Sequence, residues 1–331
     1  MTQVAGSFDT YEAVGNREEL SEAIYMITPE ETPLMTTIGR EPVKSTHPEW
    51  QMDDLATPAT NAQIEGDEWT FSEFNPTTRV GNYTQISDKK VAVTRSQDKT
   101  IKAGRKSELK RELMKKGTEL KKDMEFALLQ NNASVAGAEG TAREFGGFPA
   151  WLETNTVRHG AGADGGFNSG TGLVDAATPG TSSAFIKGDL DTVIQEVYQS
   201  GGNPNTIMLS PYCKGVFSGF AGIAELRSNQ GQGSKSQLTI FAGADMYVSN
   251  FGTLTVVPNR VMSTNAATAS NVFVIDPDKA KVGIFDDIQM HDVAKTGDAE
   301  RRVLNVEYTL LMKTEKAHGV VADVFGLTAS T

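Results

Sequence analysis

Residues 105–131 read RKSELKRELMKKGTELKKDMEFALLQN, and this stretch is the clearest helix of the sequence. One apolar stripe recurs along it at helical spacing, formed by Leu109, Leu113, Leu120, Met124 and Ala127. Asn131 and Asn132 supply a stop signal after it. At about 1.5 Å per residue, such a helix is about 40 Å long, which is about the width of a compact body built from a chain of this length. The sequence therefore predicts a long, highly charged rod.

Charge is unevenly distributed around this rod. Residues 105–125 contain eight basic and five acidic residues, a local net charge of +3, whereas residues 1–60 contain eleven acidic and three basic residues, a local net charge of −8. The chain thus combines an acidic N-terminal segment with a basic helix. Gly117 lies inside the helix and costs about 1 kcal/mol relative to alanine. It is either tolerated there or marks the close approach of another segment.

The whole chain has the composition of a folded protein. It has 331 residues, 38% of them hydrophobic, and a formal net charge of −11, so we expect neither a disordered chain nor a fibrous repeat. No apolar run approaches the roughly 18 residues of a membrane-spanning helix, and the N-terminus has no signal-peptide pattern. The single cysteine, Cys213, excludes an intrachain disulfide and fits a reducing compartment. The acidic balance argues against a dedicated nucleic-acid-binding protein but allows a local basic face.

The N-terminal segment has the features of an arm. Asn16 and Glu19 resemble a capping box, and apolar residues at helical spacing follow them until Pro29. We therefore expect a short amphipathic helix at 17–27. The prolines that follow forbid a long helix.

The next segment, residues 46–98, predicts a long β-hairpin. Extended-favouring residues at both of its ends flank a polar middle that is broken by prolines. Trp69, Phe71 and Phe74 are expected near the tip of this hairpin. A loop of this length is abnormal inside a compact domain, so we expect it to project and to find its partner elsewhere.

The second half of the chain alternates helices and strands. Residues 160–183 are glycine-rich and are expected to form a mobile surface loop. A helix capped by Asp189 and stopped by Gly201 is expected before a buried strand at Thr206–Leu209. Further strands are expected within 239–249, 253–259, 271–285 and 302–313. The last of them alternates apolar and polar residues, as a sheet with one buried face does. This order of elements indicates a layered α/β or α+β domain.

No catalytic, cofactor or metal site stands out in the sequence. The four histidines lie in separate segments and have no HExxH, GxSxG or CxxC motif beside them. Residues 229–237, NQGQGSKSQ, follow a helix and lack the Gly-Lys-Ser/Thr order of a phosphate-binding loop. Acid pairs such as Asp53 and Asp54 lack the further oxygen ligands that calcium requires. Cys213 is interpreted as a packed apolar residue. We interpret the basic face of the rod as a solvated helix face, although it could contact phosphate or an acidic partner.

Extension is the main feature of this chain. An arm, a long hairpin and a long rod each have more apolar surface than local structure can bury. These features are typical of a subunit that interlocks with other copies.

Several phrases in the first half of the chain resemble the major capsid proteins of tailed phages with the Hong Kong 97 fold. They are REELSEAIYMITPEETPLMTTIGR at 17–40, KSTHPEWQMDDL at 44–55, NAQIEGD at 61–67, GNYTQIS at 81–87, AGRKSELKRELMKKGTELKKDMEFALL at 103–129 and REFGGFPAWL at 143–152. Beyond residue 152 the similarity is mainly architectural. GGNPNTIMLSP at 201–211 resembles the helix-to-strand step of the axial domain in this family.

The resemblance implies an α+β fold of this type and a division of the chain into five segments. They are an N-terminal arm at 1–45, an extended loop (a long β-hairpin) at 46–98, a peripheral domain at 99–184 with a spine helix at 104–132 and the glycine-rich loop, an axial domain at 185–299, and returning peripheral-domain strands at 300–331. In this family the extended loop reaches over a neighbouring subunit, and the axial domain meets its copies around five-fold and six-fold axes.

The function implied by the resemblance is structural. The protein is expected to assemble into the icosahedral head of a tailed phage, to enclose double-stranded DNA and to be part of a virion that is assembled in the host cytoplasm. The implied partners are other copies in pentamers and hexamers, separate scaffolding and portal proteins, and decoration proteins, with packaged DNA contacted non-specifically and no membrane. Scaffolding is expected as a separate protein because only about sixteen residues precede the first expected helix. Lys89 and Lys90 lie near the loop, but their context does not support the covalent cross-link of some relatives.

Two other functions are considered beside the capsid. One is the shell of a cargo-enclosing nanocompartment, which has the same fold, and the other is an enzyme whose site is built from distant residues. We expect no enzymatic activity, no cofactor and no metal.

Two sets of residues are proposed to contact neighbouring subunits. Glu18 and Glu19 of the acidic arm are expected to face basic surface on an adjacent copy, where charge sets orientation more than affinity. Trp69, Phe71 and Phe74 are expected to be buried on the neighbour as aromatic anchors.

Overall fold

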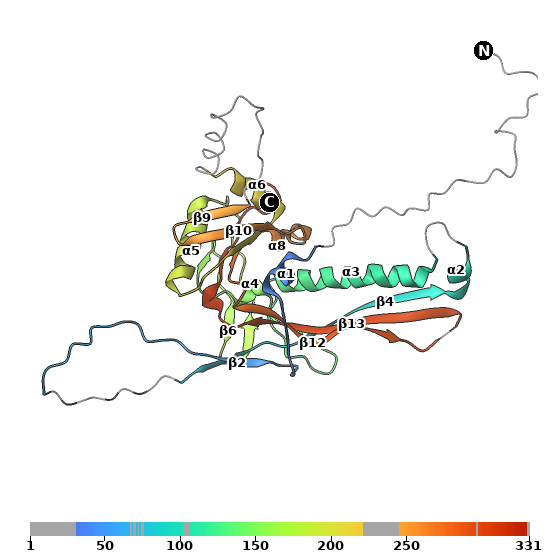
Figure 1. Cartoon of the computed structure of the whole chain (residues 1–331), viewed down its shortest axis with the longest axis horizontal. Coiled ribbons are helices and arrows are strands. Elements are labelled where there is room, and N and C mark those ends of the chain that lie inside the picture. The colour runs from blue at the N-terminus through green and yellow to red at the C-terminus, as the bar shows by residue number, and fades with distance from the viewer. Residues whose placement is uncertain are drawn as a thin grey trace, which may run out of the picture.

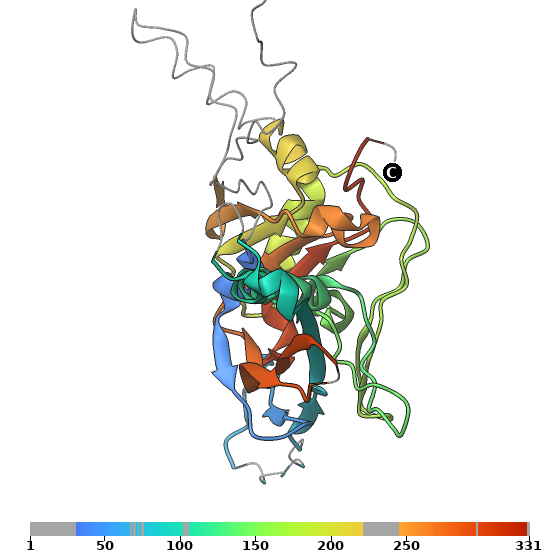
Figure 2. The same cartoon turned by 90° about the vertical axis from the view of Figure 1, so that its right-hand side faces the viewer.

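The computed structural model describes residues 31–66, 68, 71, 73, 76–101, 106–220, 245–295 and 297–329. A body that contains the six-stranded sheet extends on one side into a rod, made of a long helix above long strands, and on the other into a long loop (Figure 1). Figure 2 looks along the rod and shows its teal helix above the red and dark-teal strands of the sheet that supports it. The helix expected at 17–27 and the glycine-rich stretch 229–237 lie outside the described residues.

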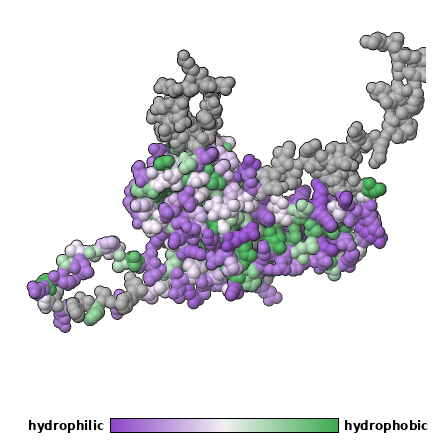
Figure 3. Space-filling model, in the orientation of Figure 1, coloured by the Kyte–Doolittle hydropathy of each residue, from purple (hydrophilic) through white to green (hydrophobic). Residues whose placement is uncertain are grey.

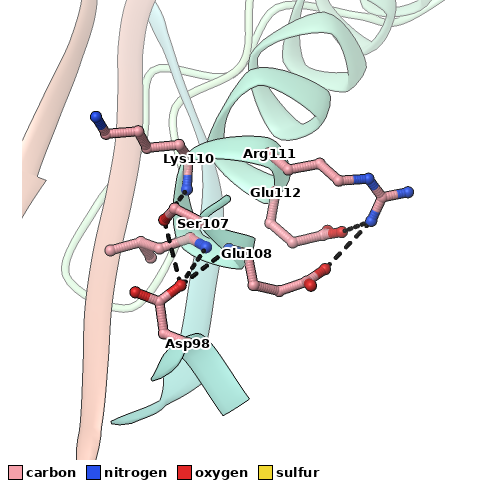
Figure 4. A network of polar contacts seen from close by, with 7 residues as sticks. Asp98, Ser107, Glu108, Lys110, Arg111 and Glu112 are labelled. Atoms are coloured by element: carbon pink, nitrogen blue, oxygen red, sulfur yellow. Dashed lines mark hydrogen bonds and ion pairs between the residues drawn. The ribbon is translucent and has the colours of Figure 1, made fainter. Parts of the chain in front are cut away.

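The rod contains the predicted long helix, α3 (Glu108–Leu129). It begins three residues later than expected because Ser107 is extended and caps it, its Oγ accepting a hydrogen bond from the Lys110 amide at 3.4 Å. Asp98 lies at the end of the short helix α2 (Arg95–Lys99) and caps the same end of α3, because its Oδ1 accepts a bond from the Glu108 amide at 2.9 Å (Figure 4). The prediction of a helix at 105–131 is thus confirmed, with α2 holding its outer end.

A four-stranded sheet supports α3. Its strands, in spatial order, are β1 (Arg40–Pro42), β12 (Ala280–Asp292), β13 (Ala299–Met312) and β4 (Gln85–Thr94). The alternating apolar residues of β13 face α3 and share one core with its apolar stripe: Leu304, Val306, Tyr308, Leu310 and Met312. Burial alternates with period two from Leu304 to Tyr308, as predicted, whereas the end of the strand up to Met312 is buried on both faces.

A six-stranded sheet forms the second core. Its strands, in spatial order, are β5 (Thr156–Val157), β14 (Gly319–Val321), β11 (Val272–Ile275), β8 (Thr206–Leu209), β10 (Gly252–Pro258) and β9 (Met246–Ser249). Helices α5 (Lys187–Gln199) and α6 (Pro211–Ser218) pack against it. The apolar stripe of α5 is the predicted one and is fully buried: Leu190, Val193, Ile194 and Val197.

Short elements complete the fold, among them two hairpins. The helical segments are α1 (Pro33–Ile38), α4 (Phe148–Trp151), η1 (Met262–Thr264), α8 (Ala266–Ala269) and η2 (Glu315–Ala317). Strands β2 (Glu49–Met52) and β3 (Thr78–Gly81) pair antiparallel and form the base of the predicted long hairpin. Strands β6 (Gly166–Asn168) and β7 (Leu173–Asp175) form the second hairpin.

The structure corrects three expectations about local structure and boundaries. The glycine-rich segment 160–183 contains the β6–β7 hairpin, extended by mutual backbone bonds between Ala163 and Thr178 at 2.8 and 3.0 Å, so it is not an irregular loop. Helix α5 begins at Lys187, which places Asp189 in its first turn and not at its cap. The boundary expected at residue 299 does not match the sheet topology.

Strand pairing explains this third correction. Strand β12 pairs along its length with β13 and belongs to the four-stranded sheet, although it lies within 185–299. Strand β14, within 300–331, belongs to the six-stranded sheet. The chain crosses between the two sheets at the turn Asp276-Pro277-Asp278, because that turn joins β11 to β12.

Candidate assembly surfaces

The loop between β2 and β3 is the most exposed part of the described chain. Three of its apolar side chains are largely exposed: Leu55 is 99% exposed, Ile64 is 80% exposed and Phe71 is 93% exposed. Figures 1 and 3 show the loop standing away from the body. Exposed large apolar side chains grouped on a projecting loop are typical of an interaction surface.

The same loop is strongly acidic. No lysine or arginine occurs between Lys44 and Arg79, whereas seven acidic residues do: Glu49, Asp53, Asp54, Glu65, Asp67, Glu68 and Glu73. Such a loop is complementary to a basic and apolar surface, because like charges across an interface are strongly unfavourable.

Aromatic stacking and an ion pair fix the root of the loop to the body. The Trp50 ring of β2 stacks on Trp151 of α4, with centroids 5.6 Å apart. At the start of the loop, Asp54 Oδ2 lies 2.5 Å from Lys316 Nζ of η2. The loop therefore leaves the body in a defined direction.

Asn82 holds the other strand of the loop's root. It follows β3 and is fully buried, and its Nδ2 donates to the carbonyl oxygens of Leu310 at 2.9 Å and Gly146 at 3.2 Å. Its Oδ1 accepts a bond from the Gly146 amide at 2.8 Å. A buried amide whose donors and acceptor are all paired costs little to bury and fixes one arrangement of its neighbours.

A buried carboxylate joins the end of the arm to the rod and the body. Glu125 of α3 is fully buried, and its Oε1 accepts bonds from the Leu34 amide and from Asn259 Nδ2, both at 2.7 Å. Its Oε2 accepts a bond from the Met35 amide at 2.9 Å. Thr32, the residue before α1, makes no side-chain cap, so Glu125 supplies the cap of α1 from 91 residues away.

Burial raises the pKa of Glu125 above its usual value of 4.5, and the hydrogen bonds from Met35, Leu34 and Asn259 oppose that shift. No cation pairs with this carboxylate among the residues that the structure describes. The arm, the rod and the six-stranded sheet are thus joined at one polar contact inside an apolar core.

The six-stranded sheet also ends in an exposed apolar edge. Strand β9 is its outer strand, and the side chains of Met246 and Val248 are exposed on it. Beside it, Tyr198 of α5 stacks on Phe251 with ring centroids 4.9 Å apart, and both rings are partly exposed. No other described strand pairs with the outer side of β9, and a strand edge with exposed apolar side chains is a surface on which another chain can pair.

The buried titratable side chains His318 and Cys213 are packed inside the fold. Burial lowers the pKa of His318 to about 3, so its ring is neutral, and its Nδ1 accepts a bond from the Asp276 amide at 3.2 Å. Cys213 is a free, buried thiol whose pKa is raised by burial, as expected for a packed residue. Within the described ranges, no group of three or more His, Cys, Asp or Glu side chains could hold a metal ion, and no helix is long and apolar enough to span a membrane.

One of the five proposed contact residues can be placed in the structure. Phe71 lies on the projecting loop, as expected. Glu18, Glu19, Trp69 and Phe74 lie outside the described residues. Sequence reasoning missed Leu55 and Ile64, which are isolated apolar residues in a polar segment and differ little from ordinary loop residues.

Sequence reasoning also missed Glu125. A signal for it exists, because Glu125 lies between Met124 and the apolar run Phe126–Leu129, where a solvated acid is out of place. The charged residues that precede it in the rod hide this signal.

The described chain thus presents a projecting acidic loop, an arm held at its base and a sheet edge with exposed apolar side chains. Solved structures share this fold. A chain from Cyanophage A-1(L), a capsid asymmetric unit, is similar with a TM-score of 0.62 and 12% identity over 93% of this chain and 97% of that one. A chain of Gordonia phage Cozz is similar with a TM-score of 0.60 and 15% identity over 97% and 96%. The holo-SrpI encapsulin of Synechococcus elongatus PCC 7942 is similar with a TM-score of 0.54 and 10% identity over 96% and 95%.

The fold is therefore that of the shell-forming Hong Kong 97 class, and it is α+β, as predicted. The SU10 major capsid protein family matches residues 4–325, so the chain belongs to that family. A major capsid protein of Escherichia phage Phieco32 is 26% identical over 98% of both chains. The protein is thus a phage major capsid protein, a structural component of the virion that self-associates into a shell.

The raised pKa of Glu125 gives a prediction for stability. An acid whose pKa is higher in the folded than in the unfolded chain stabilises the fold fully below its unfolded value, here 4.5, and this contribution is lost as the pH rises through the folded value. Glu125→Gln removes this titration at nearly constant volume. In urea unfolding of the unassembled protein, the stability of the wild type relative to this variant should fall as the pH rises from about 4 to about 7.

The matched control for this measurement is Glu139→Gln, which removes one acidic side chain at an exposed position. The pH trend should be absent there. A stability difference between wild type and Glu125→Gln that is constant, or that grows with pH, would contradict the assigned burial.

Proposed function

We propose that this capsid protein builds the icosahedral head of a tailed phage and encloses double-stranded DNA. The observation that supports this most is the acidic loop between β2 and β3, whose root is fixed to the body while its side chains Leu55, Ile64 and Phe71 are exposed. In a closed shell every copy supplies such a loop and receives one, as a repeated heterologous contact requires.

The segments divide the work of assembly. Residues 1–45 act as the arm, 46–98 as the extended loop, and α3 with the four-stranded sheet as the peripheral domain. The six-stranded sheet, with its open β9 edge, acts as the axial domain that meets its copies in pentamers and hexamers. Assembly takes place in the host cytoplasm with separate scaffolding and portal proteins, decoration proteins bind the outside, and the packaged DNA is contacted non-specifically. The protein has no enzymatic activity.

Electron microscopy of the purified protein tests the proposal. We expect closed icosahedral particles, and particles from infected cells should contain DNA. A monodisperse monomer that forms no shell under any condition would count for an enzyme instead.

A nanocompartment shell is the second candidate, supported by the similarity to the encapsulin of Synechococcus elongatus. Its TM-score of 0.54 is lower than the 0.60 and 0.62 of the two phage chains. Particles filled with protein and free of DNA would favour this candidate.

The loop aromatics give a prediction for assembly. Replacing Trp69, Phe71 and Phe74 together by alanine should leave a folded subunit, because Phe71 contributes nothing to the core of its own chain. Shell yield, measured by sedimentation, should fall at least about tenfold, since aromatic anchors dominate interface energies. The control variant changes three exposed polar residues of the same loop to alanine: Thr57, Thr60 and Asn61. Normal yield from the aromatic variant would show that the tip is not buried on a neighbour.

The acidic arm gives a second prediction. Reversing Glu18 and Glu19 to lysine should slow assembly at low salt and weaken its dependence on salt, because charge complementarity between subunits steers encounter. Light scattering during assembly at several salt concentrations measures this. Reversal of Glu139 and Glu144, two exposed acids of the body, applies the same change in net charge elsewhere. If the arm variant assembles with unchanged salt dependence, the arm does not face basic surface.

A further inference from the structure

The solvent-exposed side of α3 is broad and has lysines along its whole length, which are called the lysine face here. Lys110, Lys115 and Lys121 are exposed along it, Lys106 is exposed just before its first turn, and Lys122 is half-buried beside it. Among the residues that the structure describes, none of these five ammonium groups has a carboxylate within 4.0 Å. In Figure 4 the Lys110 side chain points away from the carboxylates drawn beside it.

Each acidic side chain of α3 is already engaged. Arg111 Nη1 lies 3.2 Å from Glu108 Oε1 and 2.9 Å from Glu112 Oε1 (Figure 4). Glu119 is held by Lys116 at 2.6 Å.

The remaining two acids of the helix are engaged by other elements. Asp123 is held at 2.5 Å by Lys89 of the sheet, and Glu125 is buried. The local net charge of +3 counts five acidic residues that are already paired or buried. It therefore understates the positive charge that the exposed lysines present to solvent.

The character of this face favours phosphate over a protein partner. Its one large exposed apolar side chain among the described residues of α3 is Met114, which is 77% exposed. Protein interfaces are depleted of lysine and need an apolar centre. Lysine, in contrast, binds phosphate as a point charge without fixed geometry. Lys110, Lys115 and Lys121 are all exposed, so the described chain leaves these positions open to solvent.

We propose that this lysine face of α3 binds the phosphate backbone of double-stranded DNA without sequence preference. The face is straight and about 33 Å long at about 1.5 Å per residue, enough to meet several successive phosphates. The proposal rests on the proposed function, because it assigns the contact with packaged DNA to named residues. If this face binds packaged DNA, α3 lies toward the inside of the shell, and the opposite face of the four-stranded sheet lies toward the outside.

Fluorescence anisotropy of a labelled DNA duplex with the unassembled, full-length protein tests this. The test variant replaces Lys110, Lys115 and Lys121 by glutamine. The control variant replaces Lys44, Lys187 and Lys279 by glutamine, three exposed lysines away from α3, and has the same net charge. Because each lost phosphate contact lowers the log–log salt slope by about 0.9, the test variant should lose about 2 to 3 from this slope and bind at least about tenfold more weakly at low salt. The control should bind like the wild type.

Three results would overturn the proposal. The first is that the wild type does not bind DNA at low salt, and the second is that the test and control variants bind DNA equally. The third is that closed shells bind added DNA as well as the unassembled protein does, since closed shells should hide the lysine face. A synthetic peptide of residues 1–32 is titrated in parallel. If the test variant loses the peptide but keeps DNA, the face binds the acidic arm instead. Electron micrographs of both variants separate this proposal from the proposed shell function. If the test variant forms intact shells and binds DNA as the wild type does, only DNA binding by the lysine face is contradicted.

Discussion

One buried carboxylate sets the geometry of this subunit. Glu125 lies on the long helix, and its two oxygens accept bonds from the first amides of α1 and from Asn259 at the end of β10. Each of these donors would be costly to bury unpaired, and so would the carboxylate itself. The arm, the rod and the six-stranded sheet therefore meet in one arrangement, and the surfaces that they present to other copies are fixed relative to each other.

This arrangement explains why so much of the chain can remain extended. The two cores hold the body, while Asn82, the Trp50–Trp151 stack and the Asp54–Lys316 pair fix the root of the loop. Beyond that root the loop is acidic, and its apolar side chains Leu55, Ile64 and Phe71 are exposed. A shell protein needs this combination, because a subunit that covered all its apolar surface with its own chain would gain little from binding other copies.

Sequence reasoning succeeded where the signal is local. The charged helix, the alternating strand β13 and the buried strand β8 follow from residue periodicity, and the structure places them within a few residues of the prediction. It failed where a residue's role depends on partners that are distant in the sequence. Strand β12 reads as a continuation of the segment before it, and only its pairing with β13 assigns it to the other sheet. Glu125 bonds to Leu34, which is 91 residues away in the sequence, and the partners of Asn82 are 64 and 228 residues away. No local pattern encodes such distant partners.

Hydrogen exchange at the amides of Leu34 and Met35 in the unassembled protein tests the role of Glu125 most directly. If the carboxylate holds the arm to the rod, both amides should exchange as slowly as that of Leu128 in the buried end of α3, and Glu125→Leu should speed their exchange while leaving β13 protected. Exchange at Leu34 and Met35 as fast as in the exposed loop, or unchanged by the substitution, would contradict this account.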